Sequence, residues 1–373
     1  MKNKINNYDF LIVGAGLIGS LAALHLFKKK YKVLVIDKNN APTNDDRTLA
    51  VNANSKEFLN ILGIWGKIKS SPEQIDKIII KDFVNSSPLV FQDTNEEMGN
   101  VIFNKDLHSE AIKELKKNRL LIQNIDIPIK DIGRNKKIII RGRNYSFSNV
   151  ILSLGKRYEN EKIIKKVVFS NSHKSFVGFF EHSVKHRQIA YEIFTPNGPL
   201  AVLPSPHKSK KKSTFIFSSK TKNSKINFEH LIKKYFNKSH GFIRVEKIVN
   251  VFEISPHLSL EKNNNFILIG DTLRSIHPVA GQGWNLGVKD IQCLSYFLDI
   301  YGAKNKNLIK KYYENRIIEN ISYLAFTSTL NKLYENQNPI NNLFIKIGFK
   351  TLKNFNVLKS LFIKQAMGRL NLI

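Results

Sequence analysis

Residues 9–37, DFLIVGAGLIGSLAALHLFKKKYKVLVID, decide the fold. The apolar run at 9–13 predicts a short buried strand, and the run at 31–36 predicts a second one. Between them lie the glycine pattern G-x-G-x-x-G and a helical segment, and an aspartate follows the second strand. A strand, a glycine turn, a helix, a strand and an acid in this order are typical of a dinucleotide-binding unit.

The three glycines and the acid each have a physical task. Gly14 permits the tight turn, Gly16 lets the backbone approach a pyrophosphate, and Gly19 allows the helix to pack closely on the strand. The start of the helix offers free N–H groups and a positive dipole end to phosphates. Asp37, 18 residues after Gly19, can accept hydrogen bonds from ribose hydroxyls. The motif predicts a dinucleotide cofactor without separating NAD from FAD.

A second segment decides between the two cofactors. The apolar run at 266–269 predicts a buried strand, and Gly270-Asp271 follows it, so a carboxylate stands at a sheet edge where it can bind a ribityl hydroxyl. Gly281 and Gly283 leave backbone N–H groups bare at a helix start expected near Gly283, which suits a flavin ring or its phosphate chain. Two nucleotide-directed loops far apart in the chain favour FAD, because FAD lies extended across its domain.

The second segment also carries a family resemblance. Residues 270–287, GDTLRSIHPVAGQGWNLG, closely resemble the second FAD motif of the flavin-dependent aromatic hydroxylases, which are like para-hydroxybenzoate hydroxylase. The match is closest to their ubiquinone-biosynthesis branch, the 2-polyprenylphenol hydroxylases. Residues 46–65 and 103–107 resemble the same branch, and Tyr313, Arg316 and 366–368 fit its C-terminal region. The resemblance covers nearly the whole chain and is weak from about 110 to 200.

The resemblance implies an α/β fold with a Rossmann-like FAD-binding domain of the GR2 flavoprotein type, an inserted antiparallel β-sheet substrate domain and a helical C-terminal region. Short β runs at 175–182, 188–194, 200–204 and 213–218 predict that sheet as a roof over a substrate pocket. The expected divisions are 1–80 and 81–170 for the first and middle parts of the FAD domain, 171–262 for the roof, 263–300 for the second FAD motif and 301–373 for the C-terminal helices.

The motifs and the resemblance together predict the residues that hold FAD. Arg47 inherits a role on the FAD side from the resemblance, and Asn104 begins a helix whose start touches FAD in the family. The full predicted set is Gly14, Gly16, Gly19, Asp37, Lys38, Arg47, Asn104, Asp271, Pro278, Gly281, Gly283, Asn285 and Leu286. No catalytic side chain is assigned, because the flavin carries the chemistry.

Four neighbouring polar side chains receive other interpretations. We expect His277 to be structural or close to the flavin rather than a general base, and Arg274 to be a surface residue. Asp290, on a helix, is interpreted as a cap or salt-bridge partner. Cys293 is expected to be buried and inert.

The resemblance implies the activity of an FAD-dependent monooxygenase of ubiquinone biosynthesis. In that family NAD(P)H reduces FAD, the reduced flavin takes up O2, and a flavin hydroperoxide hydroxylates a phenol ring, here a polyprenylated one. This sequence departs from the family at one motif, where an Asp-Gly pair is replaced by Leu154-Gly155 after the strand at 150–153. That departure puts NAD(P)H use in question. Two alternatives stay open: a non-enzymatic FAD-binding subunit of a ubiquinone-biosynthesis complex, and a flavin-dependent prenyl-chain reductase.

The amino-acid composition bears on disulfides, metal sites and charged partners. A single cysteine excludes an internal disulfide and a multi-cysteine metal site, and no metal site is predicted. The formal net charge of +29 comes with lysine, asparagine and isoleucine spread along the whole chain, so compositional drift explains it better than a partner does. Among partners, an anionic membrane surface is favoured over nucleic acid, because no nucleic-acid-binding motif accompanies the lysines.

Two features bear on where the protein works. No stretch reaches the roughly 18 to 20 apolar residues of a spanning helix, and no secretory signal begins the sequence. We therefore expect a cytoplasmic protein, with attachment to the inner face of the membrane as the further expectation. From about residue 340 the chain is amphipathic, with Phe344, Gly348, Leu352, Phe355, Leu358, Phe362, Ala366 and Leu370 on one arc. This tail either packs on the main body or contacts an anionic membrane.

Overall fold

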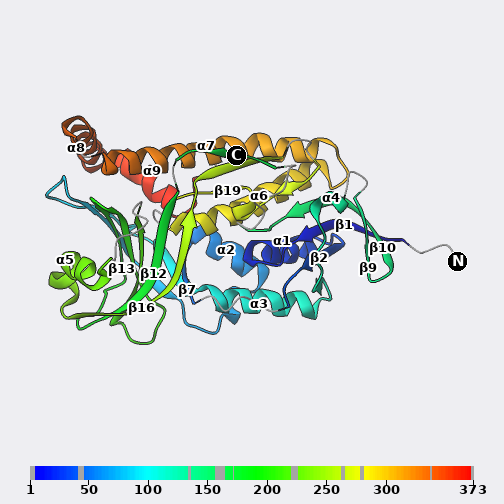
Figure 1. The fold of residues 1–373 in the computed structure, drawn as a ribbon, viewed down its shortest axis with the longest axis horizontal. Helices are drawn as coiled ribbons and strands as arrows, with labels where there is room; N and C mark the ends of the chain where they lie inside the picture. The colour runs from blue at the N-terminus through cyan, green and yellow to red at the C-terminus, as the bar shows by residue number, and fades with distance from the viewer. Residues whose placement is uncertain are drawn as a thin grey trace.

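The structure is a computed structural model that describes residues 5–40, 46–132, 136–155, 164–170, 172–219, 226–261, 265–277, 281–336 and 338–370. A parallel sheet with its helices occupies one end of the molecule, and a large antiparallel sheet occupies the other (Figure 1). Two long helices, α6 (Gln282–Tyr301) and α7 (Asn307–Glu335), lie along one side.

The parallel sheet is the one predicted from residues 9–37. Its central strand is β1, which pairs in parallel with β2 on one side and with β10 on the other. The order is β18 (Ile267–Leu268), β10 (Arg143–Leu152), β1 (Ile5–Val13), β2 (Val33–Asp37) and β8 (Leu121–Gln123), and β9 (Lys137–Ile140) pairs antiparallel with β10. Sheets of this type bind their ligands outside the carboxyl ends of the strands.

Helix α1 (Leu17–Lys28) follows the glycine turn and is covered on several sides. It contacts α2 (Ala53–Leu62), α3 (Asn104–Lys117) and α6. Gly19 lets this helix approach the turn, because a Cβ atom built there would lie only 2.1 Å from the carbonyl oxygen of Gly14. The helix–strand packing role predicted for Gly19 thus has a direct geometric basis.

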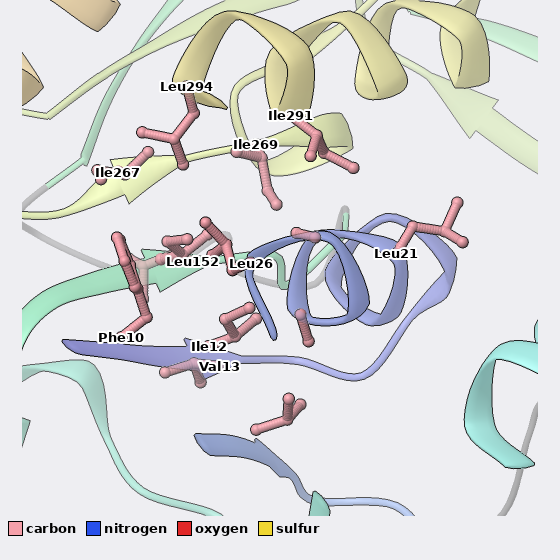
Figure 2. Close-up of a cluster of buried hydrophobic side chains, with 14 of the residues drawn as sticks. Phe10, Ile12, Val13, Leu21, Leu26, Leu152, Ile267, Ile269, Ile291 and Leu294 are labelled. Atoms are coloured by element: carbon pink, nitrogen blue, oxygen red, sulfur yellow. The ribbon is translucent and has the colours of Figure 1, made fainter. Parts of the chain in front are cut away.

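The core of this domain joins segments that are distant in the sequence. Figure 2 shows apolar side chains of β1, β10, β18, α1 and α6 meeting in one cluster together with Ile269. They include Phe10, Ile12, Leu152, Ile267, Leu21, Leu26, Ile291 and Leu294, all of which are buried. Each such burial contributes about 1.5 to 3 kcal/mol to folding. The cluster therefore fixes the second FAD motif beside the first.

The large sheet contains all four β runs predicted for the roof. They are β12 (His173–His182), β13 (Ile189–Thr195), β14 (Gly198–Pro204) and β15 (Lys212–Ser219). The full order is β16 (Ile243–Ile254), β12, β15, β14, β13, β5 (Lys77–Asp82) and β6 (Leu89–Phe91). Helix α5 (Phe228–His240) packs on this sheet through Ile232 and Phe236.

Strands β5 and β6 come from residues that the sequence assigned to the FAD domain. They extend the roof sheet at one edge. Strand β5 pairs in parallel with β13, whereas the other neighbouring strands of this sheet pair antiparallel. The side chains of β5 are all half-buried, and its sequence KIIIKD has no alternating apolar pattern that would reveal the strand's position. The domain divisions themselves stay a prediction.

The described residues also form two small three-stranded sheets. One has the order β3 (Thr48–Asn52), β7 (Gly99–Phe103) and β4 (Glu73–Ile75), and the other β11 (Ile164–Val168), β17 (His257–Glu261) and β19 (Arg274–Ser275). Short helices lie at Trp65–Lys67, Ile129–Ile132 and Gly270–Thr272; the last of these is η2.

The chain ends in α8 (Pro339–Asn354) and α9 (Asn356–Ala366). The predicted single apolar arc is wrong, because the helix is interrupted at Phe355 and each part has its own orientation. On α8, Leu352 is partly buried against the body, whereas Phe344 is exposed. Among the described helices, none has the length and apolar character required to cross a membrane.

Candidate FAD site

The turn after β1 is shaped by Gly14. Its φ of +103° lies in the region that side chains disfavour, and a Cβ atom there would stand 2.3 Å from the carbonyl oxygen of Ser153. The N–H of Ser153 in turn donates to the carbonyl of Val13 over 2.9 Å. Glycine is therefore required at this position by the folded chain itself, with or without a ligand.

Gly16 stands in a different environment. A Cβ atom built there has no heavy atom within 4 Å, so the space beside this residue is open. Gly16 is also the residue before α1, and no side chain in the described part of the protein caps the first N–H groups of that helix. Open space in front of an uncapped helix start fits a pyrophosphate, which needs both close backbone approach and free N–H donors.

Ala15 lies between these glycines, and both its backbone N–H and its backbone carbonyl are hydrogen-bonded to side chains. Its N–H donates to Oδ2 of Asp37 over 2.6 Å, and its carbonyl accepts from the hydroxyl of Ser20 over 2.9 Å. Nε2 of the buried His108 lies 2.8 Å from the same carbonyl oxygen. Ser20 and His108 were missed by the sequence analysis, because a serine and a histidine within helices carry no motif of their own.

Asp37 lies at the carboxyl end of β2, as predicted. Its Oδ1 accepts from the N–H of Asn39 over 2.7 Å, so both oxygens already take part in one hydrogen bond each. A carboxylate offers about four lone-pair sites, which leaves acceptors for ribose hydroxyls. Lys38 beside it is exposed.

The second motif begins at the carboxyl end of β18. Asp271 is exposed within η2, and the preceding Gly270 has a φ of +62°. The hydroxyl of Thr272 accepts from the N–H of Leu154 over 2.6 Å, which ties η2 to the chain that leaves β10. Gly14, Asp37 and Asp271 thus all follow strands of one parallel sheet at their carboxyl ends.

Helix α6 begins at Gln282, close to the predicted start. Gly281 precedes it with a φ of +61°, and a Cβ atom at Gly283 would meet nothing within 4 Å. The Asn285 side chain is committed to β3, since it donates to the carbonyl of Ala50 over 2.9 Å and accepts from the N–H of Asn52 over 3.2 Å.

Three further residues of the predicted FAD site make contacts within the protein itself. Leu286 is buried in the core, and Asn104 donates its N–H to the carbonyl of Arg47 over 2.9 Å, joining α3 to β3. The guanidinium of Arg47 lies 5.4 Å from the ring centre of Phe252 on β16. Pro278 lies outside the described residues.

The comparisons with known proteins agree with this geometry. Residues 7–109 match the family model of an FAD binding domain. The ubiquinone hydroxylase UbiL of Rhodospirillum rubrum is 26% identical over 98% of this chain and 90% of the relative. The ubiquinone biosynthesis monooxygenase COQ6 of Dictyostelium discoideum is 22% identical over 98% of this chain and 92% of the relative. These similarities confirm the predicted resemblance to the flavin-dependent aromatic hydroxylases and to their ubiquinone-biosynthesis branch.

Solved structures show the same fold. The p-nitrophenol 4-monooxygenase PnpA of Pseudomonas putida superposes with a TM-score of 0.73 and 15% identity, covering 97% of this chain and 99% of its own. The flavin-dependent brominase Bmp2 reaches a TM-score of 0.76 at 12% identity over 97% and 94% of the two chains. The predicted fold class is confirmed, and so are the predicted FAD-binding domain and the assignment to the FAD-dependent monooxygenases.

The second glycine segment, which begins at Gly270, rests on a buried ionic network. Asp290 accepts from the N–H of Gly270 over 2.9 Å, from Nη1 of Arg274 over 2.7 Å and from Nε of Arg316 over 2.8 Å. The predicted salt-bridge role of Asp290 is confirmed. The surface position expected for Arg274 is wrong: its side chain is buried because the guanidinium pairs with this carboxylate. Cys293 is buried as expected, and burial raises the pKa of its thiol to about 12.

His277 of the same motif lies in a chain of polar contacts. Its Nδ1 stands 3.3 Å from Nδ1 of His173, and its Nε2 stands 3.0 Å from the hydroxyl of Ser170. Nε2 of His173 is 3.1 Å from Oε1 of Glu335 at the end of α7. These contacts join the FAD loop to β12 and α7, which agrees with a structural interpretation of His277.

The departure at Leu154 also has a structural context. The leucine side chain is partly buried and packs on the core of the FAD domain, and Gly155 follows with a φ of +65°. The family's carboxylate is thus replaced by an apolar contact.

An open groove of about 990 Å³ lies at the amino ends of β1 and β2, lined among others by Asn6, Lys28 and Arg119. It is on the opposite edge of the sheet from the glycine turn and takes no part in the candidate site.

Proposed function

We propose that this protein binds FAD and uses NAD(P)H and O2 to hydroxylate the aromatic ring of a polyprenylated phenol in ubiquinone biosynthesis. The observation that carries the proposal is the position of Gly16, Asp37 and Asp271, which all lie at the carboxyl-end edge of one parallel sheet. One relative named a ubiquinone hydroxylase and one named a ubiquinone biosynthesis monooxygenase align with almost the whole chain and support the choice of substrate.

The protein's own residues would bind and orient the cofactor. The open start of α1 would receive the pyrophosphate, Asp37 would accept from the adenosine ribose, and Asp271 would accept from the ribityl chain. No side chain of the described residues caps the start of α6, which would offer N–H donors to the flavin end. FAD itself supplies the oxygen chemistry, so the protein contributes binding, orientation and exclusion of water.

The alternative of a non-enzymatic FAD-binding subunit is favoured by Leu154 alone. The leucine can make no hydrogen bond through its side chain, at a position where the family uses a carboxylate toward FAD and NAD(P)H. A prenyl-chain reductase is the other candidate on this fold.

One set of assays separates these functions. The hydroxylase should oxidise NAD(P)H faster when a prenylated phenol is present, and its product should gain about 16 mass units, against about 2 for a reductase. Absence of NAD(P)H oxidation in the FAD-loaded protein would support the inert subunit. In that case Leu154→Asp should restore flavin reduction if the missing carboxylate is the cause.

A further inference from the structure

Helix α8 exposes a continuous apolar stripe. Ile340, Leu343, Phe344 and Ile347 lie within an arc of about 100° at the helical period, and 52% to 66% of each side chain's surface is exposed. Four large apolar side chains on one solvent-facing stripe are far more than the scattered apolar residues of an ordinary surface.

The opposite face of the same helix is held against the body. Ile345 is buried against Phe194 and Tyr334, while Phe349 and Leu352 pack on the cluster that contains Leu89 and Phe91 of β6. The side chain of Asn338 caps the start of the helix by accepting from the N–H of Asn341. The stripe is therefore presented by a packed and capped helix, and its direction is fixed by the fold.

Helix α9 also exposes apolar side chains. Val357, Leu358 and Leu361 are exposed on it, and Phe355 between the two helices is 60% exposed. The helices contact each other, and α9 is fixed to α7 by a ring contact between Phe362 and Phe326. Figure 1 shows both helices beside the large sheet, at the periphery of the molecule.

The charged side chains of this C-terminal segment are all basic. Residues 338–370 contain no aspartate or glutamate and carry Lys346, Lys350, Lys353, Lys359, Lys364 and Arg369. Arg369 pairs with Glu57 and Glu96. The five lysines form no ion pair within the described part of the chain, and four of them are exposed. Their stems can lie along the apolar surface while their ammonium groups reach outward.

We infer that α8 and α9 dock this protein on an anionic lipid surface. An apolar stripe flanked by unpaired lysines has the composition of a helix that lies in the membrane interface, where apolar side chains enter the acyl boundary and lysines meet the headgroups. A second copy of this chain fits less well, because two such surfaces would bring lysines together with no acid to pair them. The inference does not depend on the proposed function, although a lipid substrate would be reached from the same surface.

The test is co-flotation of the full-length, FAD-loaded protein with vesicles of phosphatidylcholine alone or with about a third phosphatidylglycerol. We expect binding to the anionic vesicles only, weakened by salt. Lys346→Gln, Lys350→Gln and Lys353→Gln together should lower that binding by about a hundredfold, at about fivefold per lysine. Ile347→Glu with Leu361→Glu should abolish it.

Matched controls carry the same changes elsewhere. Ile139 on β9 is 69% exposed, so Ile139→Glu should leave binding unchanged, as should the triple exchange of Lys116, Lys304 and Lys306 to Gln. Equal binding to neutral and anionic vesicles would overturn the inference, and so would equal effects of control and test variants. Sedimentation as a dimer that Ile347→Glu dissociates, without vesicle binding, would assign the surface to a second copy instead.

Discussion

The carboxylate of Asp37 and the peptide N–H of Ala15 are joined by a hydrogen bond of 2.6 Å. The acid at the end of β2 therefore supports the turn at the end of β1 while it offers its remaining lone pairs outward. One residue shapes the proposed pyrophosphate site and belongs to the proposed ribose site.

Asp37→Ala should weaken FAD binding by about 1.5 to 3 kcal/mol, because a charge-assisted hydrogen bond to the turn and the ribose acceptor are lost together. Titration of the apoprotein with FAD measures this. Asp9→Ala is the matched control, since Asp9 also accepts a backbone N–H, that of Lys32, at the far end of the strands. Equal affinities of the two variants would remove Asp37 from the site.

Gly16→Val and Gly14→Val should fail in different ways. Valine at Gly16 meets open space in the protein, so the variant should fold normally and lose FAD, whose pyrophosphate needs that space. Valine at Gly14 collides with Ser153 and should unfold the protein or lower its stability by several kcal/mol. Circular dichroism with bound-flavin absorbance distinguishes the two. Retained flavin in a folded Gly16→Val protein would place the pyrophosphate elsewhere.

Asp290→Ala should destabilise the fold by about 3 to 5 kcal/mol, because it leaves the buried Arg274 and Arg316 without their shared carboxylate. The N–H of Gly270 loses its acceptor as well, so flavin content should fall. Urea denaturation measures the loss of stability. Asp299→Ala removes an exposed pair with Lys29 and should cost at most about 1 kcal/mol. Similar losses in the two variants would contradict the importance of the network.

Stability should fall in mild acid because of two buried histidines, His186 and His240. Burial, followed by neighbouring charges, lowers the pKa of His186 to about 4 and of His240 to about 3. Both rings are thus neutral in the folded protein, while the unfolded chain protonates near the ordinary value of 6.5. Their contribution is present above pH 6.5 and is lost as the pH falls toward 4.

Urea midpoints measured between pH 7 and 4.5 test this expectation. His186→Asn should flatten the profile, whereas His230→Asn, at an exposed position on α5, should not. A profile that is unchanged by His186→Asn would mean that other groups set the acid response.

The sequence predicted the glycine turn, the two acids and the roof strands because each has a local signature of spacing or alternation. It missed His108 and Ser20, which support the turn through contacts that only the folded chain creates. It placed Arg274 on the surface, because its buried partner Asp290 lies about two turns into α6 and nothing in the spacing reveals the pairing. It also misjudged the tail, where a break at Phe355 changes which apolar residues face the body.

The central claim is oxygen insertion into a prenylated phenol. The most direct measurement is complementation of bacteria that each lack one ring hydroxylase of ubiquinone synthesis, grown under 18O2, with mass spectrometry of the quinone. The account predicts that this chain restores ubiquinone in one strain, only with oxygen, and that one 18O atom enters the ring from O2. Rescue without oxygen, label arriving from water, or failure in every strain despite bound FAD would contradict it.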